Sequence, residues 1–124
     1  MLAAAALEIV LEPGLDIRES ARIVWTMSED PRRGHLAYEF MKRNFDALVA
    51  RMPRDAAAEF PHWGRQFCDE AGRADMAAFF RDRIGRIEGG PRILAQTEEA
   101  IGLCAAFKNR QRPSLTQFLR PWSK

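Results

Sequence analysis

Apolar residues recur along this chain at the three- and four-residue spacing of an α-helix, and no stretch alternates as a half-buried strand would. The clearest case is AYEFMKRNFDAL, residues 37–48, in which one helical stripe is apolar and the charges lie elsewhere. The stripe consists of Tyr38, Met41, Phe45, Leu48 and Met52, and Leu36 and Phe40 widen it. We expect a core face rather than a ligand-binding box, because the stripe is continuous and charges bound its other side.

Proline, glycine and capping residues divide the pattern into six or seven helices. These helices are expected over residues 1–11, 15–30, 31–52, 54–68, 73–87, 91–112 and 114–119. Asp16 is the expected N-cap of the second helix, and Asp30-Pro31 is the expected start of the third. Pro61 is expected to kink the fourth helix, and Pro113 is expected to end the sixth.

The other long helices each present an apolar face of their own. The residues expected to point inward are Ile17, Ala21, Val24 and Ser28 in the second helix, Met76, Phe79, Phe80, Ile84 and Ile87 in the fifth, and Ile93, Thr97, Ile101, Cys104 and Phe107 in the sixth. Short loops favour antiparallel neighbours. We therefore predict an all-α fold in which residues 1–124 form a single helical domain of antiparallel helix pairs, stacked as an irregular HEAT-like superhelix.

The distribution of charge is uneven only toward the C-terminal end. A formal net charge of +2 over 124 residues is too small to indicate a nucleic-acid partner. Residues 100–124, however, contain five cationic side chains and no carboxylate. Two interpretations are open. These cations complement the C-terminal end of a helix dipole, or they form a patch for an acidic partner or a peptide carboxylate.

The two cysteines, Cys68 and Cys104, are expected to be buried free thiols. They lie 36 residues apart within apolar helical patterns, which is neither a disulfide framework nor a metal-site spacing. Free thiols are typical of a reducing compartment, and a cytoplasmic location is expected. No stretch approaches the roughly 20 apolar residues that cross a bilayer. The first residues lack a basic segment and are expected to be an alanine-rich helix rather than a signal peptide.

No combination of residues has the spacing of a catalytic site. The zinc-peptidase pattern His-Glu-x-x-His is absent. His35 and Glu39 are one helical turn apart, but two ligands make no metal site, and a surface pair is expected. Cys68 is followed by two carboxylates, a setting that disfavours the thiolate that a nucleophile needs. We therefore expect no catalytic group within residues 1–124.

Several segments, taken in order, resemble one known family. They are AYEFMKRNFDALVARMP (37–53), FC (67–68), MAAFF (76–80), GGPRILAQTEEAIGLCAAF (89–107) and PSLTQFL (113–119). Together they are similar to the C-terminal helical domain of zinc aminopeptidases of the aminopeptidase N and puromycin-sensitive type. The family pattern places aromatic residues at Tyr38, Phe45 and Phe107 and an asparagine at Asn44. It also places Arg, Gln and an acidic residue at the positions of Arg92, Gln96 and Glu99.

The resemblance implies a HEAT-like superhelix that caps a thermolysin-like catalytic domain. Zinc, its ligands and the glutamate base would then lie upstream in that domain. This chain would be the non-catalytic C-terminal portion of a metallopeptidase that removes N-terminal amino acids from peptides. Its partners would be the catalytic domain of the same parent chain and, through Arg92, Gln96 and Glu99, the distal part of a bound peptide. The alternative role for these three residues, which we favour, is hydrogen bonding between helices.

The same observations also fit a free-standing helical interaction module. In this interpretation the basic C-terminal end is the docking surface, and the partner is a separate polypeptide. Neither interpretation includes a nucleic acid or a membrane span.

Overall fold

Helices make up every regular element of the computed structural model, which describes residues 2–123. The α-helices are α1 (Leu2–Glu8), α2 (Ile17–Ser28), α3 (Gly34–Arg43), α4 (Phe45–Arg51), α5 (Glu70–Phe80) and α6 (Gly90–Leu119). The 3-10 helices are η1 (Ile9–Leu11), η2 (Ala56–Gly64), η3 (Ile84–Arg86) and η4 (Arg120–Trp122). The prediction of an all-α fold is confirmed, since the described residues contain these helices and no strand.

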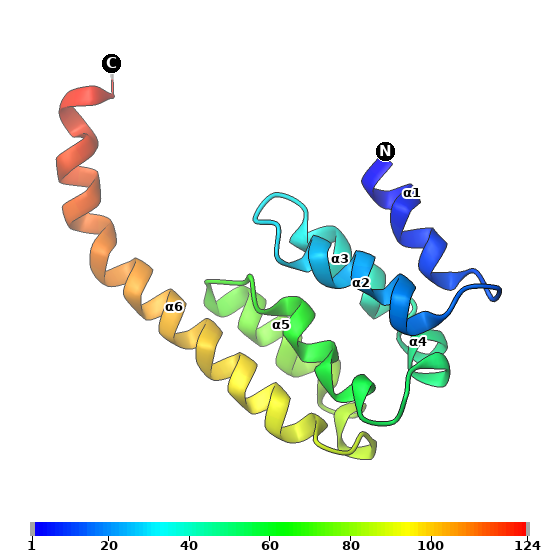
Figure 1. Ribbon diagram of the computed structural model, residues 1–124. Coiled ribbons are helices and arrows are strands. Elements are labelled where there is room, and N and C mark those ends of the chain that lie inside the picture. Colours follow the sequence, from blue (N-terminus) through cyan, green and yellow to red (C-terminus); the bar gives the residue numbers. More distant parts are fainter. Residues whose placement is uncertain (1, 124) are drawn as a thin grey trace.

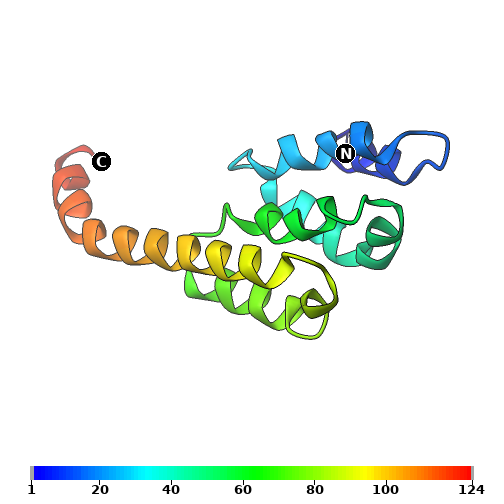
Figure 2. The same cartoon turned by 60° about the horizontal axis from the view of Figure 1, so that its bottom comes forward.

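Some helices pack against chain neighbours, as Figures 1 and 2 show, and others pack against elements farther along the chain. In both views α5 lies alongside the first half of α6, and α2 packs against α3. η2 lies between these groups and contacts α2, α3, α5 and α6. Helix pairing therefore agrees with the prediction, whereas the irregular HEAT-like superhelix remains a prediction.

The apolar stripe predicted for the third helix is buried as expected, but two helices carry it rather than one. Tyr38, Met41, Phe45 and Leu48 are all buried in one hydrophobic core. The helix breaks at Asn44, where the backbone leaves the helical region (φ −113°, ψ 18°) and the side-chain amide donates to the Phe40 carbonyl at 2.9 Å. A side-chain amide that bonds to nearby backbone competes with helix propagation, so the break has a local cause.

The third helix also begins later than predicted. The Asp30 carboxylate accepts from the Arg32 amide at 2.8 Å and closes a turn, and α3 starts at Gly34 without a side-chain cap. By contrast, Asp16 caps α2 as predicted, because its carboxylate accepts from the Arg18 amide at 2.9 Å. The inward face predicted for α2 is confirmed by the burial of Ile17, Ala21, Val24 and Ser28.

The middle of the chain departs from regular α-helix around Pro61. The fourth predicted helix is the 3-10 helix η2, which buries Phe60 and Trp63 although Pro61 has no amide hydrogen to donate. α5 begins at Glu70, three residues before the prediction, because the Asp69 carboxylate caps it by accepting from the Gly72 amide at 2.7 Å. The predicted fifth helix ends early, at Phe80, and its last turn is replaced by η3.

α6 is longer than predicted and does not end at Pro113. It runs unbroken for 30 residues to Leu119. Figures 1 and 2 show that it changes direction in its C-terminal part instead of stopping. A proline ring and its missing amide disfavour a straight continuation, and a bend accommodates both.

The prediction of two free, buried cysteines is wrong. Cys68 and Cys104 form a disulfide with their Cα atoms 5.1 Å apart, a separation typical of such bonds. Cys104 is exposed and Cys68 half-buried. The two residues are distant in sequence, but the packing of α5 against α6 brings them together. The argument for a reducing compartment therefore loses its basis.

A buried phenol and a lysine share one carboxylate between α3 and α5. Asp75 accepts from Lys42 at 2.9 Å and from the Tyr38 hydroxyl at 2.8 Å. The hydrogen bond from Lys42, followed by that from Tyr38, holds the pKa of Asp75 below its ordinary value of 3.8. Burial, followed by the hydrogen bond to Asp75, raises the pKa of the Tyr38 phenol, so Tyr38 stays protonated as a donor.

This arrangement predicts a specific dependence of stability on pH. Because the pKa of Asp75 is lower in the folded state, its contribution is present above the ordinary pKa and is lost as pH falls through the folded-state pKa. We expect Asp75→Asn to show a smaller loss of Tm than the wild type between neutral pH and about pH 2. Asp82→Asn, an exposed change on the loop after α5, is the control. Equal losses in all three proteins would contradict the prediction.

Candidate docking surface

The second half of α6 leaves the body of the molecule. Ile93, Thr97, Ile101 and Ala105 are buried at four-residue spacing along its first half. Every residue from 106 to 122 is exposed. We call residues 106–122 the arm. Figures 1 and 2 show the arm projecting away from the other helices, with the C-terminus at its far end.

The arm carries large apolar side chains that nothing in the described residues covers. Phe118 is 69% and Trp122 is 78% exposed. Exposed apolar side chains begin at Leu103, just before the arm, and continue to its tip with Phe107, Leu115, Phe118, Leu119 and Trp122. Leu115, Phe118 and Leu119 have the i, i+3, i+4 spacing of one helical face. Such a continuous apolar face on a helix is typical of an interaction surface.

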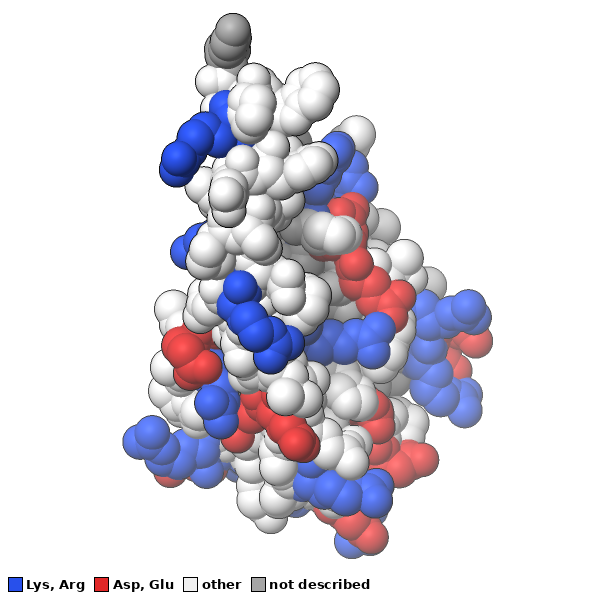
Figure 3. All heavy atoms as spheres, turned by 90° about the vertical axis from the view of Figure 1, so that its left-hand side faces the viewer, with Lys and Arg blue, Asp and Glu red and all other residues white. Residues whose placement is uncertain are grey.

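Three of the cations of this region lie along the arm, and Arg120, the C-cap residue, lies at the end of the helix. Lys108, Arg110 and Arg112 are at least seven residues from Leu119, and the last turn of α6 contains no basic residue. A helix dipole acts only within the terminal turn, so dipole compensation does not explain them. In Figure 3 the end of the arm shows white, uncharged surface with blue cationic side chains beside it. The arm is therefore amphipathic and positively charged.

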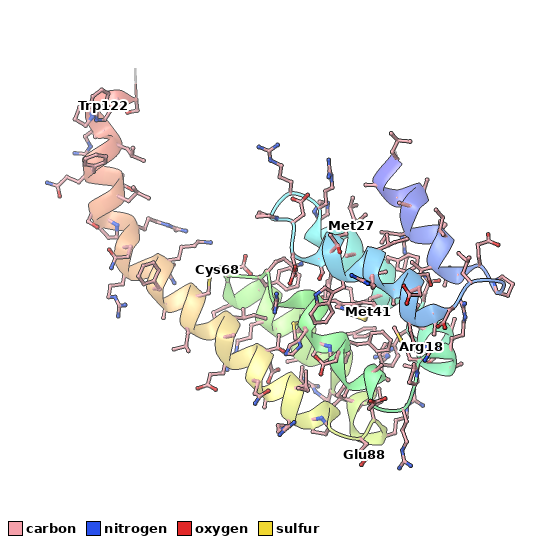
Figure 4. The ribbon with its side chains drawn as sticks, in the orientation of Figure 1. Arg18, Met27, Met41, Cys68, Glu88 and Trp122 are labelled. Carbon is pink, nitrogen blue, oxygen red and sulfur yellow. A yellow bond between two sulfur atoms is a disulfide. The ribbon has the colours of Figure 1, made fainter. Side chains whose placement is uncertain are left out.

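The base of the arm is fixed to the body by covalent and polar contacts. The disulfide joins Cys104 to Cys68, immediately before the N-cap of α5. One turn beyond Cys104, Lys108 donates to the Cys68 carbonyl at 3.4 Å. Figure 4 shows Cys68 beside α6 and Trp122 at the far end of the arm. The disulfide therefore limits how far the base of α6 can separate from α5.

The prediction that Cys104 and Phe107 face inward is wrong. Ile93, Thr97 and Ile101 are buried as predicted, but Cys104 is exposed and Phe107 is 58% exposed. The last residue of α6 that the body buries is Ala105, so the helical period continues where no neighbour remains to bury it. The sequence does contain a signal for this surface. Residues 100–124 include no Asp or Glu, and closely spaced apolar residues occur near their end.

The three residues predicted to contact a peptide, Arg92, Gln96 and Glu99, lie together on an exposed face of the first half of α6. Arg92 lines a shallow depression with Arg54 and Glu88. Within residues 2–123 none of the three makes a side-chain hydrogen bond or an ion pair. The hydrogen bonding between helices that the sequence favoured for them is therefore not found among the described residues. Their contact with a peptide remains a prediction, and they precede the arm rather than form part of it.

Other candidate ligands are engaged elsewhere. Glu39, paired with His35 in the sequence prediction, forms an ion pair with Lys42 at 3.0 Å. The other histidine, His62, contacts the Glu59 carboxylate at 2.6 Å. Across the described part of the chain no three His, Cys, Asp or Glu side chains are grouped so that they could hold a metal ion.

Comparison with protein-family models, with curated proteins and with solved structures gives no match to this chain. None of the helices within residues 2–123 combines the length and the apolar character needed to cross a bilayer. The strongest candidate for an interaction surface is the apolar, cationic arm of α6.

Proposed function

We propose that this chain is a non-catalytic docking domain that binds a protein partner through the arm. One observation carries the proposal: the exposed apolar face of Phe107, Leu115, Phe118 and Trp122 continues from a helix whose first half is buried in the core. An amphipathic helix of this kind fits into an apolar groove of a partner. Burying these side chains would supply most of the binding free energy.

The charge of the arm defines the partner further. Lys108, Arg110, Arg112 and Arg120 lie among the apolar residues of the arm, and no carboxylate side chain occurs between residues 100 and 124. A complementary groove would carry Asp or Glu side chains at its rim, which would steer association and fix the register. Two copies of the arm would repel each other, so this pattern favours a different surface as partner.

The resemblance described above supplies a candidate for that surface. We propose that the partner is the catalytic domain of a zinc aminopeptidase in the same polypeptide, and that the helical domain caps this domain and limits which peptides enter. Zinc, its ligands and the hydrolysis of peptides would belong to the catalytic domain. Arg92, Gln96 and Glu99 are then the candidates for contact with a peptide beyond the reacting bond.

The alternative is a free-standing module that docks on a separate protein. The arm supports this alternative equally well. Its exposed apolar residues and positive charge require only a partner with an acidic, apolar groove, and that groove could belong to either kind of partner. The disulfide bears on location in either case. Such bonds are typical of oxidising compartments, so the proposed cytoplasmic location no longer has the support of free thiols.

Site-specific photocrosslinking in the source cell tests the proposal. A benzoylphenylalanine crosslinker replaces Phe118 on the arm, and the same crosslinker at Leu2, which is 89% exposed on α1, is the matched control. Mass spectrometry then identifies the crosslinked peptides. We expect Phe118 to crosslink to one acidic, apolar surface, and Leu2 to give no enrichment at that surface.

The identity of the crosslinked peptide separates the two versions. A peptide from a polypeptide that contains His-Glu-x-x-His and continues into this chain supports the aminopeptidase domain. A peptide from a separate protein without that pattern supports the free-standing module and excludes the aminopeptidase assignment. Crosslinks to lipid alone, or to the same scattered proteins at both positions, contradict protein docking through the arm.

A further inference from the structure

A second surface feature lies apart from the arm, where α2 packs beside η2. It is a pocket of about 250 Å³ with a mainly apolar lining that includes Trp25, Met52 and Trp63. The polar groups at its edge are Arg18, Arg22 and Glu59. Two tryptophans with a small number of charged groups around an apolar concavity are typical of a small-molecule site.

Trp63 contributes ring surface to this lining although the residue is only 3% exposed. Its indole N–H is enclosed and has no hydrogen-bond partner among the described residues. A ligand in the pocket would therefore contact the ring and not the N–H.

The charges around the pocket leave one cation available. The Arg18 guanidinium donates to both carboxylate oxygens of Asp16, at 3.1 and 2.7 Å. Glu59 contacts the Nδ1 atom of His62 at 2.6 Å. Arg22 is exposed and makes no ion pair within residues 2–123. Arg22 therefore offers an unpaired positive charge beside the pocket, and this charge fits an anion.

The rings of the pocket are held in place from outside. The Arg65 guanidinium lies 5.7 Å from the Trp25 ring, and the His62 ring meets Trp25 edge-on with centroids 6.2 Å apart. Trp63 packs edge-on against the buried Phe60, with the ring centroids 4.9 Å apart. Preformed aromatic walls reduce the ordering that a ligand must impose. An apolar cavity of about 150 Å³ is known to bind benzene, so this pocket has room for one ring and a short chain.

We propose that this pocket binds a small aromatic monocarboxylate. The ring occupies the apolar space between Trp25 and Trp63, and the carboxylate pairs with Arg22. The proposal goes beyond the docking function and does not depend on the arm, because the pocket residues come from α2, η2 and the segment before η2.

Titration of the ¹⁵N-labelled chain with phenylacetate tests the site by NMR. The three tryptophans, Trp25, Trp63 and Trp122, each give one indole N–H signal, and Trp122 on the arm serves as an internal control. We expect saturable shifts at Trp63 and Trp25 in the millimolar range and none at Trp122. Acetate, which lacks the ring, and phenylacetamide, which lacks the charge, are expected to bind at least about 10-fold more weakly.

Two matched arginine variants complete the test. Arg22→Gln is expected to weaken phenylacetate binding about 10-fold, whereas Arg18→Gln, which removes an arginine already paired with Asp16, is expected to change it less than about 2-fold. Both residues are exposed, so the fold should survive either change. The proposal fails if phenylacetate shifts all three indole signals alike or none. It also fails if phenylacetamide binds as tightly, or if the two variants behave the same.

Discussion

Replacing Phe45 with alanine is expected to lower the free energy of unfolding by ~3–5 kcal/mol. Phe45 is 3% exposed. The centroid of its ring lies 5.5, 5.4 and 5.9 Å from the ring centroids of Phe60, Phe79 and Phe80, respectively. These contacts join α4, η2 and α5 in one core. Truncation removes both the transfer free energy of the ring and its tilted and edge-on contacts, and leaves a cavity.

Phe118→Ala on the arm is the matched control for this prediction. It removes the same ring from a side chain that is 69% exposed, and we expect a change within about 0.5 kcal/mol. Chemical denaturation monitored by circular dichroism gives both values. A loss below about 1 kcal/mol for Phe45→Ala would mean that the ring is not part of the core, and would remove the distinction between core stripe and docking face.

Removing the disulfide is the second change with a large expected effect. Cys68→Ala with Cys104→Ala is expected to destabilise the chain by about 3–4 kcal/mol, because the bond closes a loop between residues 36 apart and restricts the unfolded state. Reductant should lower the free energy of unfolding of the wild type by a similar amount and should leave that of the double variant unchanged. Denaturation curves with and without reductant provide the comparison.

The same experiment checks whether the bond is present. Thiol titration of the native protein under non-reducing conditions is expected to detect no free thiol. Detection of two thiols, together with equal stability of the wild type and the double variant, would contradict the disulfide. It would also remove the covalent tether at the base of the arm.

The fold class could be predicted from sequence because helical periodicity is local. The residues of the main stripe, such as Tyr38 and Phe45, share a face whatever their neighbours are, and their bulk favours burial. Helix boundaries were less predictable. The break at Asn44 depends on a side-chain bond to Phe40, and the passage of α6 through Pro113 depends on a bend. These outcomes come from small differences in free energy that residue type alone does not determine.

The docking surface was harder to predict for a tertiary reason. Phe45 and Phe107 occupy equivalent positions in their helical patterns, yet one is buried and the other is 58% exposed. Periodicity indicates which residues share a face, but not whether another element covers that face. The pairing of Cys68 with Cys104 has the same origin, because it depends on how α5 packs against α6. The pocket beside Trp63 likewise exists only once α2 and η2 are brought together.

Hydrogen–deuterium exchange of the arm most directly tests whether a protein partner covers it. The backbone amides of residues 106–119 are compared in the isolated chain and in the native assembly purified from the source cell, with α2 amides as internal reference. We expect rapid exchange in the isolated arm, which makes few tertiary contacts, and strong protection in the assembly, with α2 unchanged. Equally rapid exchange of the arm in both samples would contradict the account.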